Sequence, residues 1–496
     1  MKRIGIIFSL LQLVIFFSCC TNTNQKPGIC GLWVSNEKTS QVFLSGTRKA
    51  VLQIKENQEG ELTARGMFLW DDNYLMEWEL EDFQIDESNE VITIVDTDLD
   101  TFKAIFNKKD RTVKGAFFLK DSDGLADSLI LNPADKGLEI ELLYPRLPDT
   151  NGKIDYSYQK PEQLYDGLLA ASVEDVGIRP DSIISLIKKV INQEYGRLES
   201  LLILKDNKLV VEEYFYGYGK TCLHKINSCT KSITSLLLGI ALKKHKDANV
   251  GQSVFRFFPG YSSLKSNEKG QITLKNVLSM TSGLQWDEYP KEMYETNDWF
   301  QYILSRPLET EPGVNFHYNS GGTILLGGVI HFLEGKQADQ FAEEALFSPL
   351  KISEYSWETH QDGRAQCGAG LQMLPRDMAK IGLLTLNNGK WQDKQIVPED
   401  WLNESATAYI QESEFFDYGY QWWLRTKNTR QWWKDDGSND KYNMIVALGW
   451  GGQHIIVVKE LNLVVITTAS NFHNDKALSA FPMVTEEIIP AIANLN

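Results

Sequence analysis

The sequence predicts an α+β fold preceded by an all-β domain, and three observations support this fold class. Between residues 31 and 145, short runs that alternate apolar and polar residues follow one another with almost no helical periodicity. From residue 166 onward, helical patterns and strand-like runs are mixed. Strand-like hairpins stand near both ends of this second region, which predicts an antiparallel sheet whose first and last strands pair.

The first segment of the chain predicts export. Two basic residues precede an apolar run over residues 4–17, which ends at Ser18-Cys19-Cys20. We interpret residues 1–20 as a signal peptide, because the run is shorter than the roughly 20 apolar residues that cross a bilayer. Ser18 before Cys19 resembles the lipobox of bacterial lipoproteins, although two phenylalanines stand where a leucine and a small residue are usual. We therefore expect a periplasmic or cell-surface bacterial lipoprotein whose only membrane contact is a lipid on Cys19, with Cys20 or plain secretion as alternatives.

Residues 28–145 form the predicted β-rich accessory domain. Eight or nine runs with period-2 alternation are separated by turn residues, which is typical of a small antiparallel barrel or sandwich. The Gly-Leu-Trp at residues 31–33 is loosely similar to the start of lipocalin-type barrels. This region holds no catalytic constellation, so we interpret it as a packing or binding module. Residues 146–165 are polar and aperiodic, which predicts a linker to the domain over 166–496.

The composition argues against several functions. The chain is 43% hydrophobic and 23% charged, and its 66 acidic against 50 basic residues give a net charge of −16. Binding to nucleic acid, or to anionic membrane through charge, needs clustered basic residues, so we expect neither. The four cysteines after residue 20 form no Cys-x-x-Cys pair, and the seven histidines show no His-x-x-x-His spacing. We expect no disulfide framework, no metal and no cofactor.

The stretch Ser228-Cys229-Thr230-Lys231 is the strongest candidate for catalysis. Ser-x-x-Lys occurs eight times in the chain, so the spacing alone has little weight. Only Ser228 opens a helix pattern with an apolar stripe, which runs at three- and four-residue spacing over 233–241. Lys231 lies one turn later on the same face, and the free N–H groups of a first helical turn can bind an oxyanion. A lysine held against a packed helix loses solvation and becomes a base for serine, whereas the alternative is a helix cap with a solvated lysine.

Five segments of the second domain resemble, in the same order, segments of the β-lactamase-related serine hydrolases. This family holds class C β-lactamases, D-alanyl-D-alanine peptidases, esterases and aminohexanoate-oligomer hydrolases. The segments are Ser228–Leu242, Ile272–Glu288, Glu311–Ile330, Gly368–Trp391 and Val446–Thr468. The resemblance covers about residues 166–496 and implies a β-lactamase/transpeptidase-like antiparallel sheet flanked by helices. It also implies cleavage of an ester or amide bond through a covalent acyl-serine, with a small-molecule or peptide-like acyl substrate.

The resemblance implies a role for each matching residue. Ser228 would be the acylated nucleophile, and Lys231 its base or proton shuttle. Tyr318 would relay the proton to the leaving group, and Ser320 would stand where the family often has an asparagine. The backbone N–H groups of Ser228 and Trp450 would form the oxyanion hole. This set is chemically coherent, because it combines a base beside the nucleophile, a second proton carrier and two donors for the developing charge.

Two departures from the family pattern bear on the substrate. The Tyr-x-Asn motif ends in Ser320, and a hydroxyl in place of a carboxamide suits esterase or amidase members more than lactam recognition. The Lys-Thr-Gly equivalent is Ala447-Leu448-Gly449, which keeps the supporting glycine but lacks the basic residue that holds a substrate carboxylate. Lys441 is the candidate substitute for that cation. We therefore expect neither a dedicated β-lactamase nor a carboxypeptidase.

Two pairs of tryptophans lie close to the matching segments. Trp432 and Trp433 stand in a polar stretch before the last segment and are candidates for an acyl pocket. Trp422 and Trp423 are interpreted as core residues more than as pocket residues, because large aromatic side chains most often fill cores.

The preferred interpretation is an exported, esterase-like serine hydrolase. A D-amino-acid peptidase or amidase that acts on cell-wall-like peptides is the alternative among enzymes. The loss of the basic residue at position 447 keeps open a non-catalytic binding or sensor protein on the same scaffold.

Overall fold

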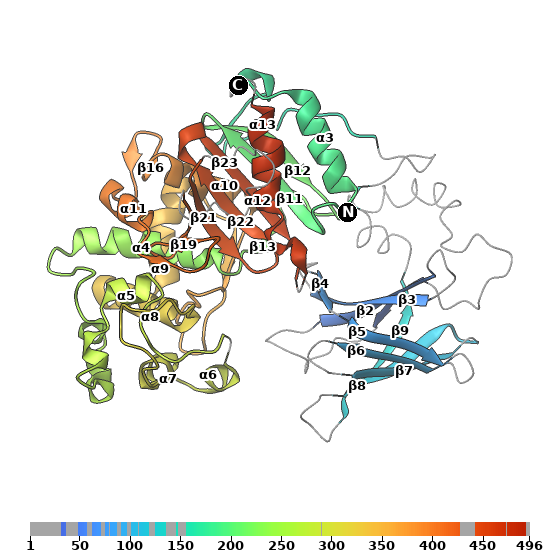
Figure 1. The fold of residues 1–496 in the computed structure, drawn as a ribbon, viewed down its shortest axis with the longest axis horizontal. Coiled ribbons are helices and arrows are strands. Elements are labelled where there is room, and N and C mark those ends of the chain that lie inside the picture. The colour runs from blue at the N-terminus through green and yellow to red at the C-terminus, as the bar shows by residue number, and fades with distance from the viewer. Residues whose placement is uncertain are drawn as a thin grey trace.

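The computed structural model (Figure 1) describes the chain between residues 31 and 492. Within that range the undescribed residues are 36–47, 57–61, 71–74, 79, 87–90, 97–100, 108, 119–124, 135–144, 147–154, 289, 427–441 and 473. The predicted lipidation site Cys19, the pocket candidates Trp432 and Trp433, and the candidate cation Lys441 therefore lie outside the described residues.

The amino-terminal part forms one antiparallel sheet in the order β4-β3-β2-β1-β9-β8-β7-β6-β5. Its strands are β1 (Gly31–Ser35), β2 (Arg48–Glu56), β3 (Leu62–Trp70), β4 (Leu75–Trp78), β5 (Leu80–Asp86), β6 (Val91–Asp96), β7 (Thr101–Asn107), β8 (Thr112–Phe118) and β9 (Leu125–Pro133). β4 and β5 form the two edges although they are consecutive in the chain, so the sheet curls until its edges approach each other. Trp33 is buried in its core and contacts Phe106 edge to face. The prediction of an all-β amino-terminal region is confirmed.

The second domain is built on a sheet in the order β10-β12-β11-β23-β22-β21-β20-β19-β18. Its strands are β10 (Leu169–Ala170), β11 (Leu198–Lys205), β12 (Lys208–Tyr214), β18 (Ile410–Gln411), β19 (Asp417–Tyr418), β20 (Trp423–Arg425), β21 (Met444–Gly449), β22 (Gln453–Val458) and β23 (Leu463–Ala469). β11 pairs antiparallel with β23, so the predicted pairing of the first and last hairpins is confirmed. Asp206 and Asn207 both have positive φ angles, 51° and 62°, which suit the tight turn between β11 and β12. The edge strand β10 pairs parallel with β12.

Helices cover both faces of this sheet, as Figure 1 shows. The α-helices are α3 (Pro180–Ile191), α4 (Cys229–Lys244), α5 (Leu274–Leu278), α6 (Lys291–Glu295), α7 (Trp299–Ser305), α8 (Ser320–Glu334), α9 (Ala338–Ala342), α10 (Pro375–Leu386), α11 (Glu399–Ser405), α12 (Ala480–Pro482) and α13 (Ile489–Ala491). Because side chains alternate along a strand, Leu202 and Leu204 of β11 join the core with α4, α8 and α10. Leu201 and Ile203 join the opposite core with α3 and α13.

Shorter elements complete the domain. The 3₁₀-helices are η2 (Glu174–Val176), η3 (Val254–Phe257), η4 (Pro259–Leu264), η5 (Lys269–Gln271), η7 (Ser348–Leu350), η9 (Lys459–Leu461) and η10 (Asp475–Leu478), and the π-helices are η6 (Glu343–Phe347) and η11 (Met483–Ile488). Two small sheets contain β13 (His224–Lys225), β14 (Tyr355–Trp357) and β15 (Leu371–Met373), and β16 (Lys390–Trp391) with β17 (Lys394–Gln395).

Helix α4 is the central helix of the domain. The sequence predicts one apolar stripe, but every residue from 229 to 241 is buried, because α8 covers α4 on one side and β21 and β22 on another. Its polar side chains have partners in this interior: Ser232 Oγ donates to the carbonyl of Gln421 (2.7 Å), and Thr234 Oγ1 to that of Cys367 (3.1 Å). Helix α4 therefore begins at the candidate site and then runs through the middle of the core.

The predicted linker lies partly against the second domain. Tyr156 is buried, and its Oη donates to Glu213 of β12 (2.6 Å). Arg146 forms an ion pair with the same carboxylate, and Tyr158 Oη donates to the carbonyl of Val210 (2.8 Å). These contacts hold the described part of residues 146–165 along β12.

Candidate active site

The loop before α4 positions Ser228. Ile226 N–H donates to the carbonyl of Leu371 (3.1 Å), which continues the pairing of β13 with β15. Asn227 then adopts a left-handed conformation (φ 48°), which asparagine tolerates better than most residues. Ser228 follows in helical geometry as the N-cap of α4 and is 9% exposed. Among the described residues, its N–H group has no hydrogen-bond acceptor.

Lys231 lies one turn into α4 and faces Ser228. Its Nζ is within hydrogen-bonding distance of Ser228 Oγ (2.9 Å), and it donates to the carbonyl of Gly368 (2.7 Å). The side chain is 1% exposed, and its burial lowers the pKa from 10.5 to about 8, against the smaller opposing effect of Glu288. Lys231 can therefore exchange a proton near neutral pH, as a base must.

Gln366 positions Gly368, whose carbonyl accepts the hydrogen bond from Lys231. Its side-chain oxygen accepts hydrogen bonds from the N–H groups of Gly368 and Ala369, both at 2.7 Å. The Gln366 side chain is almost fully buried, and its own carbonyl accepts a hydrogen bond from Trp357 Nε1 (3.0 Å). This network fixes the turn at residues 366–369, and through it the direction in which Lys231 points.

Tyr318 lies between Lys231 and an aromatic group, which is formed by Phe316, Phe416, Tyr418 and Trp423. Lys231 Nζ is 4.7 Å from the centre of the Tyr318 ring, and the ring stacks on Trp423 at 5.8 Å. Tyr318 directly precedes Asn319, whose side chain caps α8 by accepting a hydrogen bond from Gly322 N–H (2.8 Å). The N-terminal end of α8 therefore brings Tyr318 to the two residues at the start of α4.

Glu288 belongs to this site, and sequence reasoning missed it. Its carboxylate accepts hydrogen bonds from Ser320 N–H (2.8 Å), Ser320 Oγ (2.5 Å) and Trp286 Nε1 (2.9 Å). Ser320, which stands at the asparagine position of the family motif, is therefore hydrogen-bonded to a carboxylate. The available signal was chemical: a serine in place of a carboxamide needs a different partner, and Glu288 ends the second matching segment.

The turn between β21 and β22 approaches Ser228 from the other side. A Cβ on Gly449 would lie 2.3 Å from the carbonyl oxygen of Ile226, so only glycine allows this approach. Asn227 Nδ2 donates to the carbonyl of Trp450 (2.8 Å), which ties the turn to the loop before α4. The two residues assigned to the oxyanion hole, Ser228 and Trp450, are thus on adjoining segments.

Position 447, where the family has a basic residue, is apolar and inaccessible to solvent. Ala447 is fully buried in β21, pairs with Ile455 and joins the core that contains α4. The tryptophan pair divides. Trp422 is fully buried in the core that contains α4. Trp423 is partly buried: it packs against the opposite core, and it also stacks on Tyr318 beside the site.

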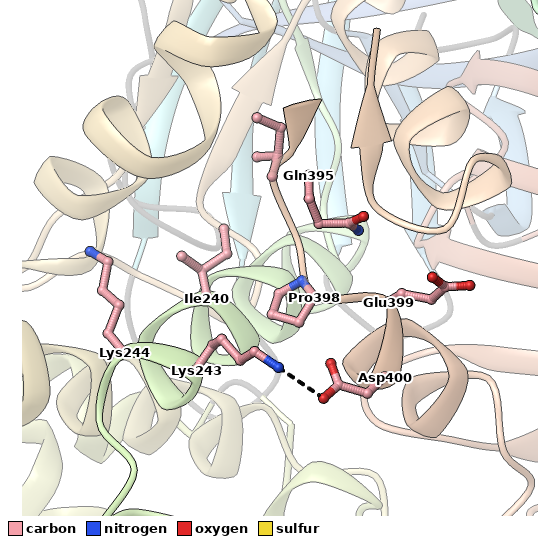
Figure 2. A pocket seen from close by; sticks show the side chains of 8 residues that line it. Ile240, Lys243, Lys244, Gln395, Pro398, Glu399 and Asp400 are labelled. Atoms are coloured by element: carbon pink, nitrogen blue, oxygen red, sulfur yellow. Dashed lines mark hydrogen bonds and ion pairs between the residues drawn. The ribbon is translucent and has the colours of Figure 1, made fainter. Parts of the chain in front are cut away.

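A surface hollow of about 480 Å³ lies at the far end of α4 (Figure 2). Ile240, Lys243 and Lys244 line it from α4, and Lys243 forms an ion pair across it with Asp400 (3.2 Å). Ile240 is twelve residues after Ser228, which places it about 18 Å along the helix axis. The hollow is therefore separate from the candidate active site.

No group of three or more His, Cys, Asp or Glu side chains in the described part of the chain is arranged to hold a metal ion. No helix within the described ranges is both long and apolar enough to cross a membrane.

Comparisons with known proteins place the second domain in a family. The family model described as Beta-lactamase matches residues 196–483. The 6-aminohexanoate-dimer hydrolase of Paenarthrobacter ureafaciens is 21% identical over 291 residues, which are 55% of this chain and 72% of that protein. Protein flp of Staphylococcus aureus (strain MRSA252) is 23% identical over 188 residues, 35% of this chain, and the match spans only 37% of that relative's length.

Solved structures agree on the fold. A Bacteroides dorei protein described as a candidate beta-lactamase has a TM-score of 0.52 at 17% identity, over 64% of this chain and 99% of that one. EstCE1, described as a hydrolase with promiscuous acyltransferase activity, has a TM-score of 0.50 at 14% identity, over 63% of this chain and 98% of that one. The family model covers more than half of the chain, and the fold that it implies is the fold observed. The chain therefore belongs to the beta-lactamase family of hydrolases.

Proposed function

We propose that this protein is a serine hydrolase that cleaves an ester or amide bond through an acyl-serine at Ser228. One observation carries the proposal: the Lys231 amine is buried, lies 2.9 Å from Ser228 Oγ and has its pKa lowered to about 8. A serine hydroxyl is a weak nucleophile until a base takes its proton. A solvated lysine is almost fully protonated at neutral pH, whereas a pKa of about 8 leaves roughly a tenth of Lys231 as free amine at pH 7.

Acylation follows from this pair. Ser228 Oγ attacks the substrate carbonyl carbon as Lys231 Nζ takes the hydroxyl proton, and the carbonyl oxygen becomes an oxyanion. The N–H groups of Ser228 and Trp450 donate to that oxyanion. When the tetrahedral intermediate collapses, the bond to the leaving alcohol or amine breaks. The leaving group receives a proton that Tyr318 relays from Lys231, and the acyl group remains on Ser228.

Deacylation reverses these roles. A water molecule attacks the acyl carbon and gives its proton to Lys231, either directly or through Tyr318. The second tetrahedral intermediate releases the carboxylic acid and returns the proton to Ser228 Oγ. The carbonyl of Gly368 accepts a hydrogen bond from Lys231 Nζ. This hydrogen bond stabilises the ammonium form of Lys231 while it carries the proton.

The surroundings favour substrates without a carboxylate. Ala447 offers no cation, and the aromatic rings of Tyr318 and Trp423 form an apolar side of the site. These features support an esterase-like activity. An amidase is the second candidate, because the name of the relative from Paenarthrobacter ureafaciens describes hydrolysis of an amide-linked dimer. A D-amino-acid peptidase requires covalent labelling by penicillin and release of D-alanine from a short peptide, and the absence of both alongside ester turnover would exclude it.

The intact mass of the protein after treatment with a fluorophosphonate tests the proposal. We expect one adduct per chain on the wild type and none on Ser228→Ala. Ser262→Ala is the matched control, because Ser262 begins another Ser-x-x-Lys but is exposed, and this variant should be labelled like the wild type. Labelling that persists in Ser228→Ala would refute the assignment. No adduct and no ester turnover in the wild type would favour a non-catalytic binding protein on this scaffold.

We also propose that the protein is exported and lipidated at Cys19. The support is the amino-terminal sequence alone, a basic start and a short apolar run that ends at a serine before cysteine. Expression in a bacterium fed a clickable fatty acid tests this proposal. We expect a lipid label in the membrane fraction that Cys19→Ala removes, and a label that remains in Cys19→Ala but not in Cys20→Ala would move the site to Cys20.

A further inference from the structure

Glu288 is an exposed carboxylate without a cationic partner in the described structure. Its three hydrogen-bond donors are all neutral groups of Ser320 and Trp286, and no lysine, arginine or histidine of the described residues forms an ion pair with it. By contrast, Glu212 pairs with Arg376 (2.7 Å), and Glu213 pairs with Arg146. An ionised carboxylate offers about four lone-pair positions, so one remains open toward solvent.

The contacts of Glu288 lead directly to the nucleophile. It holds Ser320, and Ser320 lies so close to Gly368 that a Cβ on that glycine would come within 3.2 Å of the Ser320 side chain. The carbonyl of Gly368 accepts the hydrogen bond from Lys231 (2.7 Å), which contacts Ser228. Burial lowers the pKa of Lys231 and raises the pKa of Tyr418, and the negative charge of Glu288 is a smaller influence that acts upward on both. The carboxylate is therefore connected to the catalytic pair through Ser320 and Gly368.

The charge balance of the site is opposite to that of a site for carboxylate substrates. The position that carries the family's basic residue is the fully buried Ala447, whereas Glu288 contributes a fixed negative charge. Near pH 8 Lys231 is only partly protonated, so it does not fully offset that charge. Aromatic faces attract cations as well, and the partly exposed Trp423, which stacks on Tyr318, supplies aromatic surface on this side of the site.

We propose that Glu288 is a specificity-determining residue that selects acyl substrates bearing an alkylammonium group, by pairing with that cation beside Ser228. This inference rests on the proposed hydrolase function. In the bound state the cation occupies the open side of the carboxylate, and the hydrogen bonds from Ser320 and Trp286 keep the carboxylate aimed into the site. Substrates with a carboxylate in the same place are repelled by Glu288 and find no cation at Ala447.

A purely structural role for Glu288 makes a different prediction. If the carboxylate served only to hold Ser320 at the start of α8, its loss would slow every substrate alike. If it binds a cation, its loss slows charged substrates more than neutral substrates of the same shape. The comparison therefore needs pairs of substrates that differ in charge alone.

Two isosteric ester pairs provide this comparison. Butyrylcholine is matched by 3,3-dimethylbutyl butyrate, with the charge in the alcohol. The p-nitrophenyl ester of 4-(trimethylammonio)butyric acid is matched by that of 5,5-dimethylhexanoic acid, with the charge in the acyl group. The kcat/KM of each ester is measured at pH 9.5 for the wild type, Glu288→Gln and Asp287→Asn. Asp287 is the matched control because it is the neighbouring exposed carboxylate, and its substitution removes the same charge without touching Ser320.

The expected result is a preference of at least about tenfold for the cationic member of one pair, in the wild type and in Asp287→Asn. In Glu288→Gln we expect this preference to fall below about threefold, whatever change in rate the two esters of a pair share. No preference in the wild type, or equal losses for both members in Glu288→Gln, would overturn the inference while leaving the hydrolase function intact. Failure of all four esters together with absence of fluorophosphonate labelling would instead remove the proposed function, and this inference with it.

Discussion

Replacement of Lys231 by methionine should abolish catalysis and stabilise the fold near neutral pH. The Lys231 side chain is 1% exposed, and burial lowers its pKa from 10.5 to about 8. A group whose pKa is lower in the folded than in the unfolded state binds fewer protons when folded, so stability rises with pH between these two values. Below pH 8 the buried ammonium is unfavourable, and the lowering of its pKa from 10.5 to about 8 costs the folded state about 3 kcal/mol.

Methionine has a similar length and no charge, so Lys231→Met removes this cost at every pH. The variant also loses the hydrogen bonds to Ser228 Oγ and to the carbonyl of Gly368, which we take to cost about 1–2 kcal/mol at any pH. The net expectation at pH 7 is a gain of about 1–2 kcal/mol in the free energy of unfolding.

Denaturant unfolding at pH 7 and pH 10, followed by tryptophan fluorescence, measures this effect. Lysines and tyrosines elsewhere titrate in both proteins, so the difference between variant and wild type isolates Lys231. That difference should shift by about 2.5 kcal/mol in favour of the wild type between the two pH values. A difference that does not change with pH would refute the reasoning, since it would mean that the folded state leaves the pKa of Lys231 unperturbed.

Three further predictions concern activity. The kcat/KM for a neutral ester should fall as pH decreases through about 8, because Lys231 becomes protonated. Glu288→Gln should move this fall to lower pH, because the negative charge of Glu288 acts to raise the pKa of Lys231 against the larger effect of burial. An unchanged pH profile in the variant would contradict this electrostatic role. Gly449→Ala should reduce the rate of fluorophosphonate labelling at least about tenfold, because a Cβ there would lie 2.3 Å from the carbonyl oxygen of Ile226, and wild-type labelling would contradict the close approach. Trp423→Ala should raise the KM for long-chain esters more than for acetate esters, as a chain-length series would reveal, and equal effects would exclude an acyl-binding role for this side chain.

Several elements of the fold follow from local pattern. The runs before residue 145 alternate apolar and polar residues, so each strand has one apolar face. This pattern is typical of an antiparallel sheet that buries one face in a core. The hairpin at Asp206 and Asn207 is encoded in those residues, because both tolerate the positive φ that the turn needs. The start of α4 at Ser228 follows from the apolar pattern after it. In each case the signal and the structure lie within about ten residues of each other.

Other features arise only when distant segments meet. Glu288 is one carboxylate among 66 acidic residues, and it becomes part of the site because α8 brings Ser320 to it from 32 residues away. Trp423 has the same local sequence context as Trp422, yet Trp422 directly precedes β20 and is fully buried in the core, whereas Trp423 begins β20 and stacks on Tyr318.

The sequence by itself determined the family, the two classes of domain and the serine and lysine that begin α4, because these depend on short-range spacing and on the order of motifs. The tertiary structure alone decided the electrostatics of the site. Burial depends on which segments pack around a residue, and at Lys231 it lowers the pKa to about 8, which the proposed role as a base requires. The same packing closes the position of the missing cation at Ala447 and leaves Glu288 exposed beside the nucleophile, so the charge that a substrate meets is a property of the assembled fold.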